Sequence, residues 1–467
     1  MRTLLMFFPL PELARLGDPL PIAASSGKVR LEEAVDIVEK RIIDRLGVSG
    51  ERGRIEGPWP WAVALERLSG NWAALEKALN TWLRTTPGSG NGGENEQTSG
   101  ISRAIHNFFR ADGPPVQPNR RQVRELAEVA LLGPGNVLYR AVGRVFGERD
   151  DLAKRIELVT STSVTGLRTY FDLADFHLLL RDQQRYQHPA AIRRAVWDGN
   201  LESTLDEYLS TLRGLGTLRQ EHGVEEKILL TMNQALTIGA GRVLVRETGS
   251  EVSREPFRIR CHAALPFGLA DQERESGSGE LHSDALRISF NSPFRPYVLA
   301  TTSIGQEGLD FHVWSRHVIH WDLPSNPVDL EQREGRVDRY AGLAVRHALA
   351  KLGAKLPASQ SPWRTLAESQ EESLNGLAPW WICKDASIRR SVLVPPFSRI
   401  ADDLQVLRDQ LSVYRLALGQ ADQEALMHVL QRRVEEAGED EKKILAWLDE
   451  ARIDLAPKCS PSTESVR

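Results

Sequence analysis

Apolar residues recur at helical spacing along much of the chain. In each of these stretches, apolar side chains lie three or four positions apart, which is the period of one buried helix face. Eight stretches share this spacing: residues 31–46, 61–83, 122–132, 171–185, 201–215, 400–418, 423–436 and 441–453. We therefore predict that the chain is mostly helical up to about residue 230 and again near its C-terminal end.

A different pattern occupies residues 227–350. Short runs rich in β-branched and aromatic residues alternate there with helical stretches. We predict four strands, at residues 242–246, 257–265, 297–302 and 317–322, followed by a helix at residues 327–340. Strands that alternate with helices are typical of a parallel sheet with crossover connections. We expect the third and fourth strands to be neighbours in that sheet.

These patterns divide the chain into three parts. Residues 1–226 form a largely helical accessory or insertion region, residues 227–352 an α/β domain with a parallel sheet, and residues 353–467 a helical extension with a polar tail. Residues 87–100 contain no apolar side chain, and their glycines lack the spacing of a phosphate-binding loop. We predict an exposed flexible loop there.

The composition is that of an ordinary globular protein. Its 59 lysines and arginines nearly balance 63 acidic residues, and 41% of its residues are hydrophobic, which excludes a wholly disordered chain. A nucleic-acid partner would therefore have to meet a local basic face. Three widely separated cysteines exclude a disulfide framework or a four-cysteine zinc site. We see no signal peptide and no membrane span, so we expect a cytoplasmic protein with no membrane partner.

Polar residues follow the strand predicted at residues 297–302. The hydroxyls of Thr301 and Thr302 stand at its end, and the loop that follows contains Gly308 and ends in Asp310. In open parallel sheets, ligands bind at the carboxyl ends of strands, where hydroxyls and glycines can approach phosphates. The alternative is structural, because a threonine-rich strand end before a glycine turn is common in proteins of every kind.

The helix predicted from residue 327 has a clear start and a polar face. Asn326 is a good N-cap, and Pro327 suits the first helical position, where a missing N–H costs nothing. Gln332, Arg336 and Arg339 stand at i, i+4 and i+7, so in a continuous helix they share one face. Two guanidiniums on one face repel each other unless an anion lies between them, so this spacing favours an anion site.

The alternative for this helix is a solvated surface with internal ion pairs. Its arginines would then pair with its own acids: Arg333, Arg336 and Arg339 with Glu331, Glu334 and Asp338. Gly335 argues against that arrangement. A glycine inside an exposed helix costs about 1 kcal/mol, unless another backbone or a ligand must come close.

Two segments of this region resemble motifs of superfamily 2 helicases. Residues 332–339 read QREGRVDR and match the Q-x-x-G-R-x-x-R pattern of motif VI, and residues 301–311 match motif V. The strand and the DLPSNP turn between them resemble most closely those of bacterial Swi/Snf-like helicase-type ATPases. The resemblance implies that residues 227–352 are a helicase C-terminal lobe, the second RecA-like lobe of such an enzyme.

The resemblance implies catalytic roles for three residues of motif VI. Arg336 and Arg339 would be arginine fingers, which stabilise charge on the transferring γ-phosphoryl group. Gln332 would help to organise the γ-phosphate and the attacking water.

The resemblance implies binding roles in motif V. Asp310 would couple the nucleotide to the loop, and Gly308 would allow close approach. Thr301 and Thr302 would contact the nucleic-acid backbone, since hydroxyls suit phosphate contacts that do not depend on base sequence.

The sequence lacks the motifs of a first helicase lobe. It contains no G-x-x-x-x-G-K-[ST], and no Asp-Glu-x-His or Asp-Glu-Ala-Asp phrase follows an apolar strand. ATP with Mg²⁺ would therefore be bound jointly with a first RecA-like lobe in another chain or an upstream segment, and we expect no ATPase activity from this chain alone. We expect DNA as the nucleic-acid partner. The alternative is a non-catalytic module, derived from a helicase lobe, that binds protein or nucleic acid.

Two further clusters are weaker candidates. His312, His317 and His320 are close in sequence, but no cysteine or carboxylate completes the spacing of a metal site, and we predict no metal. Arg389 and Arg390 could contact backbone phosphates, although a solvated surface is the commoner role of such a pair.

Overall fold

The structure is a computed structural model, and its described residues fall into two compact units. Unit 1 comprises Met1–Leu265, Glu275–Val298 and Lys355–Thr365, and unit 2 comprises Pro266–Arg274, Leu299–Ala354 and Leu366–Arg467. The described residues are 6–48, 59–85, 117–147, 150–172, 188–216, 223–237, 241–245, 257–261, 283–301, 310–351, 363, 380–381, 383, 385–416, 423–436, 440, 442–444 and 446.

Three predicted features lie wholly or mostly outside those residues. They are the loop at residues 87–100 and the helices at residues 171–185 and 441–453. The predicted domain boundaries after residues 226 and 352 stay predictions.

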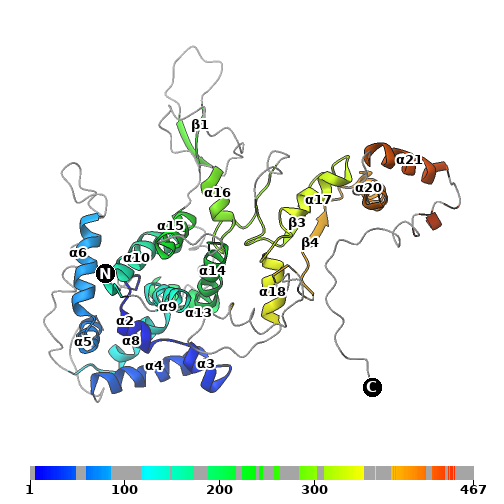
Figure 1. Ribbon diagram of the computed structural model, residues 1–467. Helices are drawn as coiled ribbons and strands as arrows, with labels where there is room; N and C mark the ends of the chain where they lie inside the picture. Colours follow the sequence, from blue (N-terminus) through cyan, green and yellow to red (C-terminus); the bar gives the residue numbers. More distant parts are fainter. Residues whose placement is uncertain are drawn as a thin grey trace, which may run out of the picture. The chain divides into compact units, whose positions relative to one another are not determined.

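Unit 1 is built from helices and one pair of strands (Figure 1). Its α-helices are α2 (Pro11–Leu16), α3 (Leu20–Ser26), α4 (Leu31–Leu46), α5 (Trp59–Ser69), α6 (Trp72–Thr85), α8 (Arg120–Leu132), α9 (Pro134–Phe146), α10 (Leu152–Thr160), α11 (Arg168–Phe171), α13 (His188–Asp198), α14 (Leu201–Gly216), α15 (Val224–Thr237) and α16 (Ser283–Phe290). A π-helical stretch, η1 (Ser161–Leu167), joins α10 to α11, and the strands are β1 (Gly241–Val245) and β2 (Phe257–Cys261).

Local sequence signals explain where several of these helices begin and end. The side chain of Asn119 accepts the Gln122 N–H at 2.9 Å, and the Gln122 side chain accepts the Asn119 N–H at 3.0 Å, which together cap the start of α8. The predicted helix at residues 31–46 is confirmed as α4. The stretch at residues 61–83 instead forms two helices, because Gly70 adopts a φ of +79° between α5 and α6.

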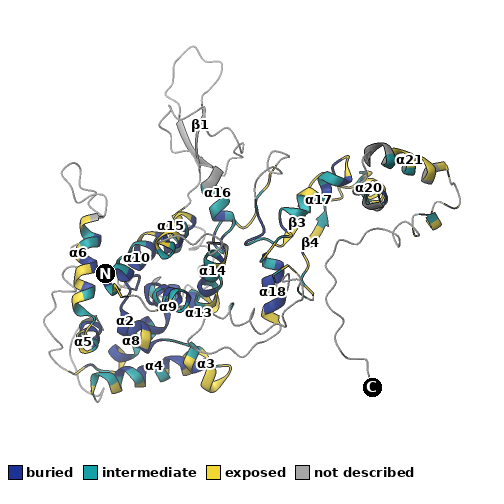
Figure 2. Ribbon diagram, in the orientation of Figure 1, coloured by how far each residue is buried: buried dark blue, intermediate teal, exposed yellow. Residues whose placement is uncertain are grey.

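The buried residues of unit 1 concentrate on α2, α8 and α9 (Figure 2). Two glycines permit the backbones to approach this closely. A Cβ at Gly17 would lie 2.3 Å from the carbonyl group of Ala130, and a Cβ at Gly135 would lie 2.5 Å from the carbonyl oxygen of Phe7. The end of α2 and the segment before it are therefore packed directly on α8 and α9.

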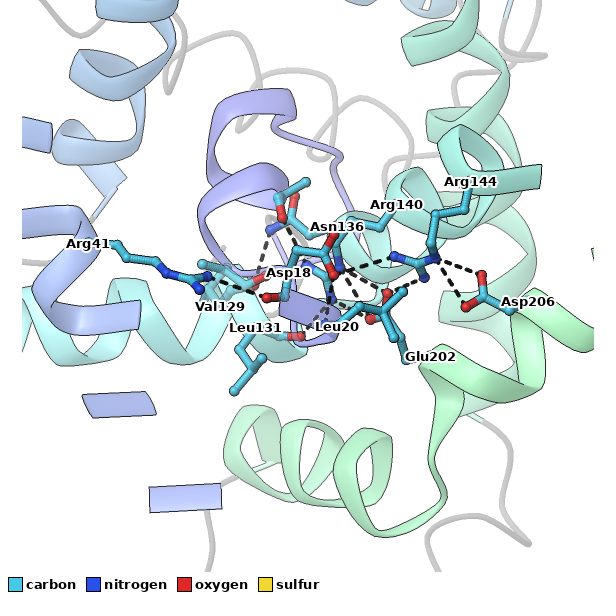
Figure 3. Close-up of polar contacts among 12 residues, drawn as sticks. Asp18, Leu20, Arg41, Val129, Leu131, Asn136, Arg140, Arg144, Glu202 and Asp206 are labelled. Carbon is cyan, nitrogen blue, oxygen red and sulfur yellow. Dashed lines mark hydrogen bonds and ion pairs between the residues drawn. The ribbon is translucent and has the colours of Figure 1, made fainter. Parts of the chain in front are cut away.

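A buried ion cluster joins α9 to α14 (Figure 3). Arg140 and Arg144, one turn apart on α9, both contact Glu202, and Arg144 also contacts Asp206 at 3.0 Å. Burial opposes the charge of Glu202, but the two arginines outweigh it and hold its pKa below the usual value. Burial raises the pKa of Asp206 to about 6. Arg140 also donates to the carbonyls of Ala130 and Leu131, at 2.7 and 2.8 Å, so the cluster ties the end of α8 to α14.

Unit 2 combines helices with a parallel pair of strands. Its elements are β3 (His317–His320), α17 (Pro327–Gly335), α18 (Leu343–Lys351), β4 (Arg389–Val392), α20 (Ile400–Leu416) and α21 (Gln423–Glu436). The predicted helix at residues 423–436 is confirmed as α21. α17 packs on α20, and α20 packs on α21.

The strand pairing differs from the prediction. Residues 297–301 are described but form no strand, and the parallel partner of β3 is β4, with His317 opposite Arg389 and His320 opposite Val392. β1 and β2 pair antiparallel, not as members of a parallel sheet. The β3–β4 pair is parallel, but β4 lies outside residues 227–352, where the parallel sheet was predicted, and a full RecA-like sheet stays a prediction.

Candidate functional site

The turn between β3 and α17 has the predicted start signal. The side chain of Asn326 accepts the Val328 N–H at 2.8 Å, Pro327 is the first helical residue, and Asp329 places a carboxylate in the first turn. A side-chain cap and an early acid both stabilise a helix N-terminus. The start of the helix is confirmed.

The predicted end of α17 is wrong. The helix stops at Gly335 instead of residue 340, because the Val337 and Asp338 N–H groups both donate to the carbonyl of Glu334, at 2.9 and 3.0 Å. This shared acceptor tightens the last turn, and the chain then leaves the helix axis. The close approach expected at Gly335 is also not found among the described residues, since a Cβ there would meet nothing within 4 Å. A glycine at the end of a helix destabilises the helix less than one in its interior. The position of Gly335 at the end of α17 is therefore compatible with an open surface.

The described end of motif V is joined to motif VI. The Phe311 N–H donates to the carbonyl of Arg336 at 3.0 Å. Arg339 pairs with the carboxylate of Asp310, and its Nε donates to the carbonyl of Gly335 at 2.9 Å. Arg339 therefore reaches Asp310 from the turn after the helix and not from the helix face that the spacing predicted.

The remaining candidate residues are less connected. Gln332 is exposed on α17, and Arg336 is the C-cap of that helix. The Arg336 side chain is half-buried and has no hydrogen-bond or ion-pair partner in the described part of the chain. Thr301 is exposed, and Thr302 and Gly308 lie outside the described residues. The structure thus brings Asp310 and Arg339 into contact, and it joins the Arg336 backbone to Phe311, the residue after Asp310.

The acids and arginines of α17 do not pair among themselves in the manner of a solvated helix. Arg333 donates to the carbonyl of Asp322 at 3.0 Å, upstream of the helix. Glu334 accepts from Arg390 of β4 at 2.6 Å and lies 3.4 Å from His320 of β3. Burial opposes the charge of Glu334, but these two neighbours outweigh it and lower its pKa.

His312, two residues after Asp310, lies inside the unit. Burial lowers its pKa, Asp310 opposes that shift, and the positive charges of Arg339 and Arg346 add to it. A histidine held neutral in this way next to the Asp310–Arg339 pair adds no further positive charge to the site. Its Nδ1 has no hydrogen-bond partner among the described residues.

The sequence interpretation missed Arg346. This side chain is 1% exposed, donates to the carbonyls of Ala341 and Val313 at 2.7 and 2.5 Å, and lies 5.0 Å from the ring centroid of Trp314. It therefore fastens α18 to the segment that follows Asp310. The sequence could have indicated this buried arginine, because Arg346 lies on the apolar face of the helical stretch LAVRHALAK.

Other ligand chemistry is not indicated by this geometry. In the ranges that the structure describes, no group of three or more His, Cys, Asp or Glu residues could hold a metal ion, and this includes His312, His317 and His320. Among the same residues, no helix has the length and apolar character that crossing a membrane requires.

Comparison with known proteins gives one match. Residues 283–341 match the helicase conserved C-terminal domain, a segment that contains α16, β3, α17 and motif VI. No curated protein and no solved structure matches the chain. The match supports the resemblance of this segment to the C-terminal lobe of superfamily 2 helicases, over a shorter stretch than residues 227–352.

Proposed function

We propose that the chain supplies the second RecA-like lobe of an ATP-dependent helicase or translocase acting on DNA, of the Swi/Snf-like kind. Helicase C-terminal domains generally engage nucleic acid and a partner lobe. A first lobe, in another chain or an upstream segment, binds ATP with Mg²⁺. This lobe adds Arg336 and Arg339 on the phosphate side, and Thr301 and Thr302 contact the DNA backbone.

One observation carries the proposal: Arg339 pairs with Asp310, and the backbone of Arg336 is bonded to the residue next to Asp310. The Arg336 backbone is hydrogen-bonded to Phe311, its guanidinium is without a partner among the described residues, and Arg339 is paired with Asp310. A guanidinium without an acidic partner leaves a positive charge that an anion can neutralise. A triphosphate offers pairs of oxygen acceptors that the planar fork of a guanidinium can bind with two hydrogen bonds.

The residues present fit a nucleotide phosphate but not a complete nucleotide site. Phosphoryl transfer needs a phosphate cradle, a metal site and a positioned water in addition to arginine fingers. The chain contains no Walker A sequence to form such a cradle. Arg336 and Arg339 therefore act only once a first lobe holds the nucleotide.

The test compares the chain alone with the chain joined to its first lobe. The first lobe is sought in the reading frame upstream and in the proteins that copurify with the chain. We expect no DNA-stimulated ATPase activity from the chain alone and clear activity from the joined lobes. Arg336→Ala and Arg339→Lys should each lower kcat at least about 10²-fold with a much smaller change in KM, since finger residues act in the transition state.

An exposed arginine outside motif VI provides the matched control. Arg316→Ala removes an exposed arginine of the same unit whose side chain has no partner among the described residues, and it should leave kcat unchanged. Equal turnover by Arg339→Lys would remove Arg339 from the finger role. A chain that binds DNA but gains no ATPase activity with any first lobe would favour the non-catalytic module.

A further inference from the structure

A residue outside the matched helicase segment holds the turn that carries Arg336. This turn, the Arg336 turn, comprises residues 334–339. Arg390 of β4 lies beyond the end of the match at residue 341, yet it contacts the turn at two acids. Its Nε donates to Glu334 at 2.6 Å, and its terminal nitrogen lies 3.6 Å from Asp338.

These two contacts bracket Arg336. Glu334 lies two residues before it and Asp338 two residues after it, so one guanidinium bridges both sides of the turn. The carbonyl of Glu334 also accepts hydrogen bonds from the N–H groups of Val337 and Asp338, so both the backbone and the side chain of Glu334 stabilise the turn. A forked guanidinium is suited to this task because it offers several donors in one rigid plane.

The strand pairing fixes Arg390 in turn. Val318 of β3 lies opposite Arg390 in the parallel register, and the Leu393 N–H donates to the carbonyl of His320 at 2.9 Å. His320 is 4% exposed and approaches the other carboxylate oxygen of Glu334 at 3.4 Å. Glu334 is thus bonded to Arg390 of β4 and lies beside His320 of β3.

We infer that Arg390 is a positioning residue that sets the placement of Arg336, so that the working lobe extends to β4. This inference rests on the proposed function for its catalytic consequence only. Arg390 is exposed, as the solvated-surface interpretation expected, but its guanidinium is paired with two acids of the turn. Arg390 does not touch the nucleotide in this arrangement, because its donors are directed at the two acids of the turn and at the carbonyl of Ile388.

The first experiment needs no enzymatic activity. Hydrogen–deuterium exchange is measured on the full chain for peptides that cover residues 328–342. Arg390→Ala should speed exchange of the Val337 and Asp338 amides at least about threefold, since the lost contacts are charge-assisted but half-exposed. Glu334→Gln should do the same, and the double variant should exceed Arg390→Ala only slightly, because both changes remove the Arg390–Glu334 contact.

Arg389→Ala is the matched control. Arg389 is the adjacent residue of the same strand, is exposed, and has no side-chain partner in the described part of the chain. Its removal should leave exchange in residues 328–342 unchanged. Arg390→Lys should restore only part of the protection, because a single ammonium cannot bridge both acids. No change in Arg390→Ala, or an equal change in Arg389→Ala, would overturn the inference.

The second experiment uses the joined lobes. Arg390→Ala should lower kcat about tenfold or more with KM nearly unchanged, and Arg390→Lys should recover part of that loss, whereas a merely structural strand residue would alter neither parameter selectively. Wild-type kcat in Arg390→Ala despite faster exchange would overturn the positioning role. Inactive wild-type lobes would instead count against the proposed function, and the exchange experiment would still decide whether Arg390 holds the turn.

Discussion

The guanidinium of Arg339 is paired with the carboxylate of Asp310, 29 residues earlier in the chain. Both side chains are partly exposed, at 36% and 42%. The pair joins the described end of motif V to the last arginine of motif VI. It also keeps Arg339 at the place where an anion could replace or join Asp310.

Removing this pair should change the stability of the chain very little. Half-exposed ion pairs contribute about 0 to 1 kcal/mol, since water screens the attraction and ordering two side chains costs entropy. We expect Asp310→Asn to shift the free energy of unfolding by less than about 1 kcal/mol, as measured by urea denaturation. A larger loss would show that the pair holds the fold together and is not available to a ligand.

Two glycines of unit 1 should respond in opposite directions to alanine. Gly17→Ala would place a Cβ 2.3 Å from the carbonyl group of Ala130, so α2 and α8 would have to separate. Such overpacking costs about 1 to 3 kcal/mol or more. Gly143, in the interior of α9, has nothing within 4 Å of its Cβ position, and Gly143→Ala should stabilise the helix by about 0.5 to 1 kcal/mol. Thermal unfolding of both variants tests this contrast, and a destabilised Gly143→Ala would contradict it.

The free energy of unfolding should depend strongly on Glu202, the acid at the centre of the buried ion cluster. Glu202→Gln leaves two buried arginines, Arg140 and Arg144, without one of their acids, and breaking a buried ion pair costs roughly 3 to 5 kcal/mol. The matched acid-to-amide control is Asp198→Asn, which removes the exposed pair with Arg194 and should cost less than about 0.5 kcal/mol. Urea denaturation measures both, and similar losses in the two variants would contradict the assigned role of Glu202.

Local signals explain which elements could be predicted from the sequence. The helices at residues 31–46 and 423–436 follow from their apolar period, and the start of α17 follows from Asn326 and Pro327. These features depend on residues only a few positions apart. They are therefore visible without any knowledge of the fold.

The errors occurred where distant residues decide the structure. β3 pairs with β4, more than 60 residues further along, and no local pattern names that partner. The pairing of Arg339 with Asp310 was not predicted, because α17 was expected to continue to residue 340. The helix ends at Gly335, so Arg339 does not lie on the predicted helix face. The cluster around Glu202 did have a signal, since two arginines at i and i+4 on α9 face two acids at i and i+4 on α14.

Glu66 of α5 caps the N-terminus of the neighbouring helix α2. Its carboxylate accepts the Glu12 N–H at 3.0 Å and the Leu13 N–H at 3.2 Å, and α2 has no side-chain cap of its own. Glu66 is 0% exposed. Burial raises its pKa to about 7, although these N–H groups oppose the shift.

This raised pKa makes stability depend on pH. Because the folded chain holds the Glu66 proton more tightly than the unfolded chain, the contribution of neutral Glu66 is fully present below about pH 4.5 and is lost as the pH rises to about 7. Glu66→Gln keeps an oxygen acceptor for the two N–H groups and cannot ionise. Relative to the wild type, it should therefore gain up to about 3 kcal/mol of unfolding free energy between pH 4.5 and pH 7.5. Urea denaturation across that range measures the gain, and Asp198→Asn should follow the wild-type profile. A constant difference between Glu66→Gln and the wild type at every pH would show that Glu66 has the same pKa in the folded and unfolded chains, and the buried carboxylate would then cap α2 as an anion near pH 7.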